Sequence, residues 1–212
     1  MRKTRTGFTV LSFLLNVVGL GAQSGEPGMK IEVQIYNYSA FSAETLARTE
    51  QETSRIFERI GVTTILRFCP HTSQEEVRNE ACTLPEAPTR LTLRLFSNSK
   101  ANRGKLGADV FGYALLPANE GFGVAANVYA DRIQKPPDGG ECAEVILGRL
   151  IAHELGHLLL GRNGHSAAGI MHTPWRREDL ELHRGGAMLF LPGEAKRIRA
   201  QVLARMSSAN TR

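Results

Sequence analysis

Two histidines and a glutamate near residue 155 have the types and the spacing that metal-assisted chemistry needs. They are His153, Glu154 and His157, in the segment Ala-His-Glu-Leu-Gly-His-Leu. On a helix, residues four apart share a face, so both imidazoles can reach one tetrahedral Zn²⁺ at about 2.0 to 2.1 Å. Glu154 then lies beside the metal, where it can take a proton from a metal-activated water and pass it to a leaving amine. The segment therefore predicts a zinc-dependent hydrolase with Glu154 as general base and acid.

The third metal ligand is expected shortly after this segment, because a catalytic zinc takes three protein ligands and keeps one position open. Gly161 can end the helix, and the short turn over 162–164 can bring His165 back to the metal. His172 is the alternative histidine further along the chain. We predict His165 as the third ligand and Zn²⁺ as the cofactor.

These residues resemble the motif of the metzincin metallopeptidases, His-Glu-x-x-His-x-x-Gly-x-x-His followed by a turn that contains a methionine. The matching residues are His153, Glu154, His157, Gly161 and His165. Here the glycine and the last histidine lie four and eight residues after His157, whereas the family places them three and six residues after its second histidine. The resemblance implies a zinc metallopeptidase whose substrate is a peptide or a protein.

Met171, in the sequence Gly-Ile-Met, matches the methionine of the metzincin turn. The resemblance implies that Met171 forms an apolar floor beneath the metal ligands. It also implies an edge strand that runs above the active-site helix and pairs with extended substrate. Residues 123–129 either take that place or form an ordinary interior strand. Pro174 and Trp175 either wall a pocket for a substrate side chain or belong to the core.

Two other interpretations of the same segment remain open. The thermolysin-like gluzincins take their third ligand from a glutamate about twenty residues past the second histidine, and Glu178 lies 21 residues past His157. Alternatively, the chain is an exported binding protein that keeps the zincin-like fold and has lost peptidase activity.

The N-terminal segment has the composition of a secretory signal. Residues 1–22 have a basic start, an apolar stretch over 8–20 and small residues at 21–22. Their removal would lower the formal net charge from +5 to +2, which is too weak to argue for a nucleic acid or a membrane surface. We expect a secreted or periplasmic protein with no stable membrane anchor, whose residues 23–212 form one monomeric domain.

The three cysteines fit an exported protein if two of them pair. Cys69 and Cys82 flank a polar loop that a disulfide could close, and Cys142 would then be left over. The sequence also allows Cys142 to pair with either of the other two.

The patterning of apolar residues predicts the elements that position the motif. Alternating or β-branched runs predict strands over 30–36, 62–68, 90–96 and 124–133. Helical spacing predicts helices over 42–60, 141–160 and 192–206. Residues 97–121 are rich in glycine, asparagine and small residues, with an apolar island at 110–116, and this composition predicts a long surface loop with a little local structure. We therefore expect an α+β, zincin-like fold, in which helices flank a twisted mixed sheet of about four to five strands.

Overall fold

A computed structural model of the protein shows a mixed sheet with helices packed on one of its faces. The structure describes residues 28–39, 41–69, 82–83, 87–96, 110–118, 122–130, 133, 143–175 and 188–209. Within these ranges, no helix combines the length and the apolar character needed to cross a bilayer. The expected signal segment, Cys142 and Glu178 lie outside the described residues.

The sheet has five strands in the order β2-β1-β3-β5-β4. The strands are β1 (Lys30–Tyr38), β2 (Thr63–Cys69), β3 (Arg90–Phe96), β4 (Gly112–Leu115) and β5 (Ala125–Tyr129). The first four in this order run parallel to one another, and β4 pairs antiparallel with β5. The mixed sheet and its helices confirm the α+β fold class.

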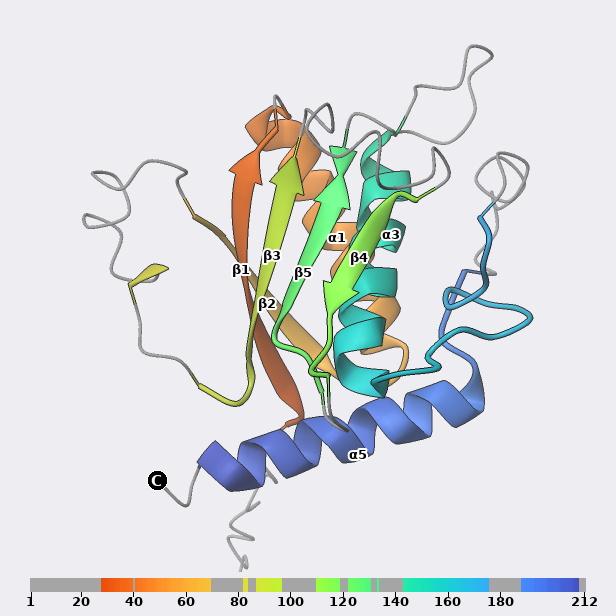
Figure 1. The fold of residues 1–212 in the computed structure, drawn as a ribbon. Helices are drawn as coiled ribbons and strands as arrows, with labels where there is room; N and C mark the ends of the chain where they lie inside the picture. The colour runs from red at the N-terminus through yellow and green to blue at the C-terminus, as the bar shows by residue number, and fades with distance from the viewer. Residues whose placement is uncertain are drawn as a thin grey trace, which may run out of the picture.

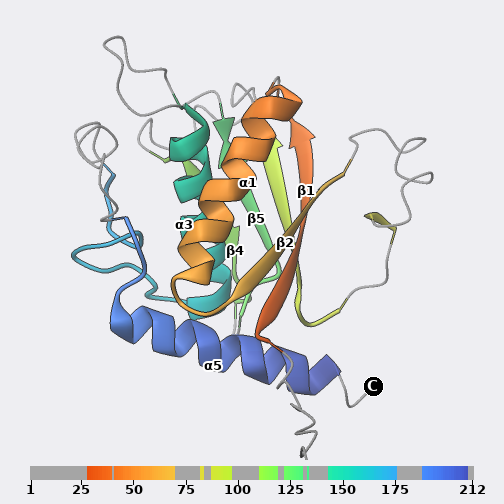
Figure 2. The same ribbon diagram turned by 180° about the vertical axis from the view of Figure 1, so that it is seen from behind.

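The described residues form three helices that pack against the sheet, α1 (Ala43–Glu58), α3 (Ala143–Leu160) and α5 (Pro192–Ala209). Figures 1 and 2 show α1 and α3 side by side on one face of the sheet, while α5 crosses one end of the sheet. The apolar residues of the inner strands, such as Val33, Leu93 and Val128, meet buried residues of α1 and α3 in one core. This packing fixes α3 against the sheet, with β4 as the nearest edge.

Helix α5 is anchored to the rest of the fold by a buried arginine. The guanidinium of Arg205 donates hydrogen bonds to the carbonyls of Pro88, Gly123 and Leu158, at 2.9, 2.9 and 3.1 Å. These carbonyls come before β3, before β5 and near the end of α3. Arg205 therefore ties the C-terminal helix to the sheet and to the end of α3.

Two further contacts stabilise the sheet. Cys69 and Cys82 form a disulfide, which is one of the pairings that the sequence allows. Glu32 on β1 forms ion pairs with Arg67 on β2 and with Arg90 on β3. The carboxylate of Glu32 therefore links three adjacent strands on the face of the sheet opposite the helices.

Most predicted elements agree with the structure to within a few residues, but the loop over 97–121 does not. Its apolar island contains β4, which pairs with β5 over the register Gly112↔Val128 to Leu115↔Ala125. Of the two roles left open for residues 123–129, the structure supports the interior strand: β5 lies between β3 and β4, and β4 is the edge strand. Helix α5 also continues to Ala209, beyond the end predicted at residue 206.

Candidate metal centre and cleft

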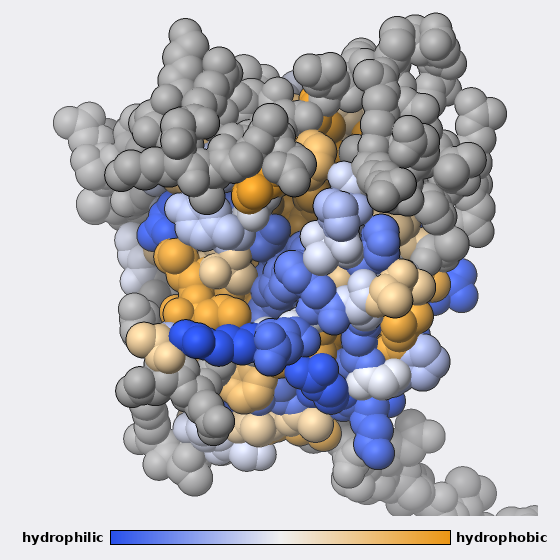
Figure 3. Space-filling model, turned by 45° about the vertical axis from the view of Figure 1, so that its right-hand side comes forward, coloured by the Kyte–Doolittle hydropathy of each residue, from blue (hydrophilic) through white to orange (hydrophobic). Residues whose placement is uncertain are grey.

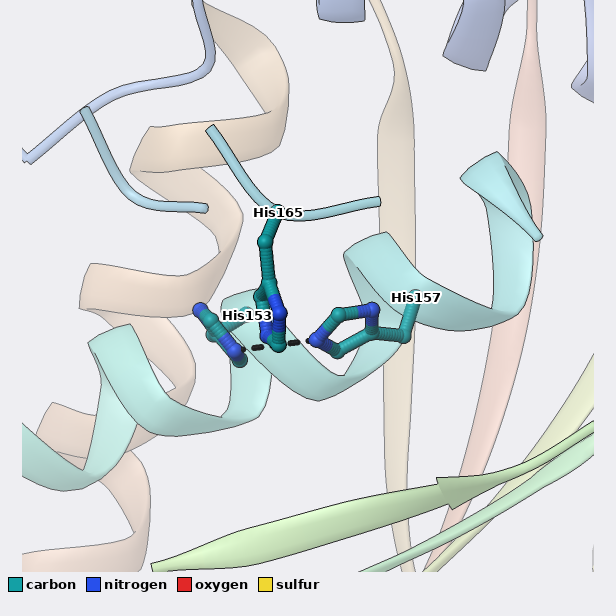
Figure 4. Close-up of side chains that lie close together, drawn as sticks. All are labelled: His153, His157 and His165. Atoms are coloured by element: carbon teal, nitrogen blue, oxygen red, sulfur yellow. Dashed lines mark hydrogen bonds between the residues drawn. The ribbon is translucent and has the colours of Figure 1, made fainter. Parts of the chain in front are cut away.

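Three histidines from one helix and the loop that follows it point toward one another. His153 and His157 project from the same face of α3, and His165 reaches them from the loop (Figure 4). Each ring offers one nitrogen such that the three atoms lie within 4.8 Å of one another. The structure therefore brings together the three histidines that the sequence singled out, in a group that could hold a metal ion.

The ring of His153 is held in one orientation from behind. Its Nδ1 lies 2.7 Å from the carbonyl oxygen of Ile170, which can only accept, so Nδ1 carries the proton and donates. Nε2 of His153 then carries a lone pair, which can accept a hydrogen bond from Nε2 of His157 at 3.1 Å or bind a metal ion. A backbone carbonyl that fixes the tautomer in this way is typical of metal-binding histidines.

Burial keeps the rings of the two helical histidines neutral. It lowers the pKa of His153 to about 4, against the opposing effect of the Ile170 carbonyl, and the charge of His165 lowers it further. Burial also lowers the pKa of His157, to about 3, together with the charges of His153 and His165. Both imidazoles are therefore unprotonated at neutral pH, as a metal ligand must be.

The turn that delivers His165 depends on left-handed backbone conformations. Gly161 has φ +73° and its N–H donates to the carbonyl of His157 at 2.9 Å, which ends the helix. Asn163 has φ +60°, a conformation that asparagine tolerates better than most residues. A Cβ added at Gly164 would lie 2.9 Å from Nδ1 of His157, so this position has no room for a side chain.

Glu154 lies on α3 between the two histidines but is not part of the three-nitrogen group. Its side chain is buried, and Oε2 has no hydrogen-bond partner among the residues that the structure describes. In the absence of a cation, burial raises the pKa of Glu154 to about 8, and a metal ion held beside it would lower that pKa toward the ionised form that a general base needs. On the side of β4, the carboxylate packs against Gly112, where an added Cβ would lie 2.6 Å from Oε1.

Met171 and His172 differ in their relation to this group. Met171 is fully buried and packs against α3, since a Cβ added at Gly156 would lie 2.5 Å from its Sδ. His172 does not join the three histidines; its backbone N–H donates to the carbonyl of Gly169 at 3.2 Å. The structure therefore places the alternative histidine outside the group.

The three histidines line a cleft of about 710 Å³. Its floor is formed by four residues of α3, Leu150, His153, Glu154 and His157. One wall is formed by residues 110–114 and 116, on and beside β4, and the other by residues 161–165 and 173–175. Pro174 and Trp175 belong to the second wall, which agrees with one of the two roles expected for them. On this side of the molecule, hydrophilic residues gather across the middle with hydrophobic ones on both sides (Figure 3).

Sequence reasoning missed two kinds of cleft residue. The wall from β4 includes Gly112 and Tyr113, whose only signal was the short apolar island. Arg162 was treated as part of a connecting turn, yet it also lines the cleft. The carbonyl of Ile170, which orients His153, is a backbone group and has no signature in the sequence.

This donor set fits a zinc ion. Zinc binds imidazole nitrogen readily, and a catalytic site offers three protein ligands with one position open to substrate. Glu154 provides a second indication, because a buried carboxylate without a hydrogen bond is costly unless a nearby cation compensates it. His153, His157 and His165 would hold the ion, with Glu154 beside it.

Comparisons with known proteins support the fold. No family model and no curated protein sequence matches the chain. Among solved structures, the archaemetzincin of Methanopyrus kandleri is similar, with a TM-score of 0.52 at 16% sequence identity over 84% of this chain and 99% of that one. Metalloproteinase-II of Bacteroides fragilis gives a TM-score of 0.51 at 14% identity over 82% of this chain and 53% of the other, so this chain spans about half its length. The protein therefore has the α+β fold of zincin-like metallopeptidases.

Proposed function

We propose that the protein is a zinc-dependent metallopeptidase of the metzincin type, with His153, His157 and His165 as zinc ligands and Glu154 as general base and acid. The observation that carries this proposal is the convergence of three imidazoles in a cleft, beside a buried carboxyl group with one oxygen that has no hydrogen-bond partner among the described residues. The likeness of the fold to two metallopeptidase structures supports it.

The reaction would be the hydrolysis of a peptide bond in the cleft. A bound zinc ion supplies a Lewis acid that lowers the pKa of water and polarises the substrate carbonyl. Glu154 takes the proton from the attacking water and delivers it to the amine nitrogen as the C–N bond breaks. The hydroxyl group joins the carbonyl carbon, so the products are a carboxylic acid and an amine.

The surrounding residues would keep this geometry fixed. The Ile170 carbonyl holds His153 with Nε2 toward the ligand group, and the buried side chain of Met171 supports α3 from below as the proposed apolar floor. Trp175 packs edge-on against His153, with ring centroids 5.2 Å apart. These contacts favour a ligand set that is positioned before the metal binds.

We further propose that the mature protein begins after residue 22, is secreted or periplasmic, and acts as a monomer on peptide or protein substrates. The Cys69–Cys82 disulfide supports this location, because disulfides persist mainly in oxidising compartments.

The zinc site is tested by metal analysis of purified variants. We expect about one zinc per chain in the native protein and in the His172→Ala variant, and its loss in His165→Ala. The His172→Ala variant is the matched control, because His172 lies close in the chain but outside the three-histidine group. The ligand set would be refuted if His165→Ala retained its zinc or if His172→Ala lost it.

The catalytic role is tested with Glu154→Gln, which preserves shape and removes the base. We expect full zinc content and a loss of peptidase turnover by about 10²- to 10⁴-fold. If the native protein with zinc cleaves no member of a diverse peptide library, the chain is not a peptidase, and a binding protein with a zincin-like fold is then the better interpretation.

A further inference from the structure

Arg162 connects the two walls of the cleft at one end. It follows Gly161 in the turn after α3, and its Nη2 donates to the carbonyls of Pro117 and Ala118 at 3.2 and 2.8 Å. Both carbonyls belong to the segment that leaves β4, just past Leu116. The guanidinium is therefore held in a fixed position between the turn of His165 and the end of the edge-strand wall.

The guanidinium is held at one nitrogen only. Its Nε and Nη1 make no hydrogen bond or ion pair within the part of the chain that the structure describes, and the side chain is exposed. Among the described residues that line the cleft, Arg162 is the only arginine or lysine, and Glu154 is the only acidic residue. Arg162 is therefore a cation at the end of the cleft, and its Nε and Nη1 can donate hydrogen bonds to a ligand.

We propose that Arg162 binds a carboxylate of the substrate, which makes the protein selective for peptides with an acidic group at that end of the cleft. The carboxylate comes either from an Asp or Glu side chain or from the C-terminus of the peptide. This inference rests on the proposed peptidase function and names its substrate class.

The chemistry of the guanidinium suits this task. Its planar fork matches the two oxygens of a carboxylate, and such charge-assisted pairs are stronger and more directional than neutral hydrogen bonds. Because the bonds to Pro117 and Ala118 already hold the group, less conformational entropy is lost when substrate binds. Arg162 would act on binding and selectivity, since the proton transfer belongs to Glu154.

The test uses matched pairs of fluorogenic peptides built from any sequence that the native protein cleaves. One arm replaces Gln by Glu at each position in turn, and the other compares a free C-terminal carboxylate with its amide. We expect kcat/KM to favour one acidic series by about 10- to 100-fold, the range typical of a hydrogen bond to a charged group. The arm that shows the preference identifies the source of the carboxylate.

Three variants separate recognition from structure. Arg162→Gln should abolish the preference, and Arg162→Lys should retain part of it while keeping a charge near the two carbonyls. The matched control is Arg197→Gln, because Arg197 Nη2 also donates to a backbone carbonyl, that of Leu160 at 2.9 Å, but Arg197 is not part of the cleft lining. Thermal unfolding and zinc content of each variant show whether the fold and the metal site persist.

A second readout measures binding without turnover. In the Glu154→Gln background, calorimetry compares the affinities for the acidic peptide and its neutral partner, with and without Arg162→Gln. A preference that disappears with Arg162 supports the inference. Equal binding and cleavage of both peptides, or a preference that survives in Arg162→Gln, overturns it while leaving the peptidase function intact. Failure of the native protein to cleave any peptide overturns the proposed function, and this inference with it.

Discussion

Gly112 should be required for activity because the Glu154 carboxylate occupies the space that a side chain there would fill. In Gly112→Ala, the new Cβ would lie 2.6 Å from Oε1 and 2.9 Å from Cδ of Glu154, whereas ordinary contacts begin at 3.4 Å. The carboxylate would have to move by about 0.8 Å to restore such a contact. A displacement of about 1 Å at a reacting group can cost on the order of 100-fold in rate, so we expect kcat to fall by about that factor with zinc content unchanged.

Gly123→Ala is the matched control for strain in the strand pair. Its Cβ would lie 2.3 Å from the carbonyl of Leu115 and 2.6 Å from Leu158, so it disturbs the same β4–β5 hairpin without touching Glu154. The Gly112 substitution also approaches the carbonyl of Asn127, at 2.7 Å, and part of its effect is therefore structural. A loss of kcat in Gly123→Ala as large as in Gly112→Ala would show that strain in the hairpin, and not the position of Glu154, controls the rate.

A double-mutant cycle on stability tests the same contact without relying on activity. Overpacking of this kind costs about 1 to 3 kcal/mol, and removal of the carboxylate in Glu154→Ala should relieve part of that cost. Urea unfolding of the zinc-free single and double variants measures the coupling. The reasoning is refuted if Gly112→Ala lowers the free energy of unfolding equally in both backgrounds, or if it leaves kcat unchanged.

Three further predictions concern the stability of the fold. Arg205→Met should lower the free energy of unfolding in urea by about 3 kcal/mol or more, because three carbonyls lose their donor; a loss below about 1 kcal/mol would contradict this. Burial favours a raised pKa for Glu32, but hydrogen bonds and charges from its two arginine partners outweigh burial and lower the pKa below 4.5. The resulting stabilisation is present above pH 4.5 and is lost as the pH falls through the lowered pKa of Glu32. The Tm difference between the native protein and Glu32→Gln should therefore shrink from pH 7 to about pH 3, and a constant difference would refute this prediction. Replacing both Cys69 and Cys82 by Ser should cost about 3 kcal/mol for a loop closed over 13 residues, and a reductant should then destabilise the native protein but not the double variant.

The sequence predicted those elements whose apolar pattern is local. Strands such as β1 and β3 alternate with period 2, α1 repeats with helical spacing, and α3 is a long apolar run that ends at Gly161, so these elements could be inferred without knowing the fold. Strand β4 covers only Gly112–Leu115 in a stretch rich in glycine and small residues, and it forms because β5 offers a partner. Strand order is likewise a property of the whole sheet, which is why the sequence left residues 123–129 open between an edge strand and the interior strand that β5 is.

The same distinction applies to the candidate site. His153, Glu154 and His157 could be predicted because one helix sets their spacing. Gly112 and Arg162 could not be predicted, because each contacts a segment that is distant in the sequence. Gly112 on β4 packs against Glu154 of α3, and Arg162 in the turn after α3 donates to carbonyls after β4. Residues of this kind become visible only when the fold has brought distant parts of the chain together.

The position of His165 depends on the conformation of its turn more than on the number of residues in it. The turn places the third histidine eight residues after His157, two more than in the motif that it resembles, yet the ring centroids of His157 and His165 are 4.5 Å apart. Two left-handed residues, Gly161 and Asn163, reverse the chain within this interval, and the bare Gly164 lets the backbone pass close to His157. A longer connection can therefore bring the third histidine to the other two if residues that tolerate positive φ lie where the chain must turn. A pattern with the family's fixed spacing would therefore miss this group of histidines, whereas Gly161, Asn163 and Gly164 mark where the chain turns.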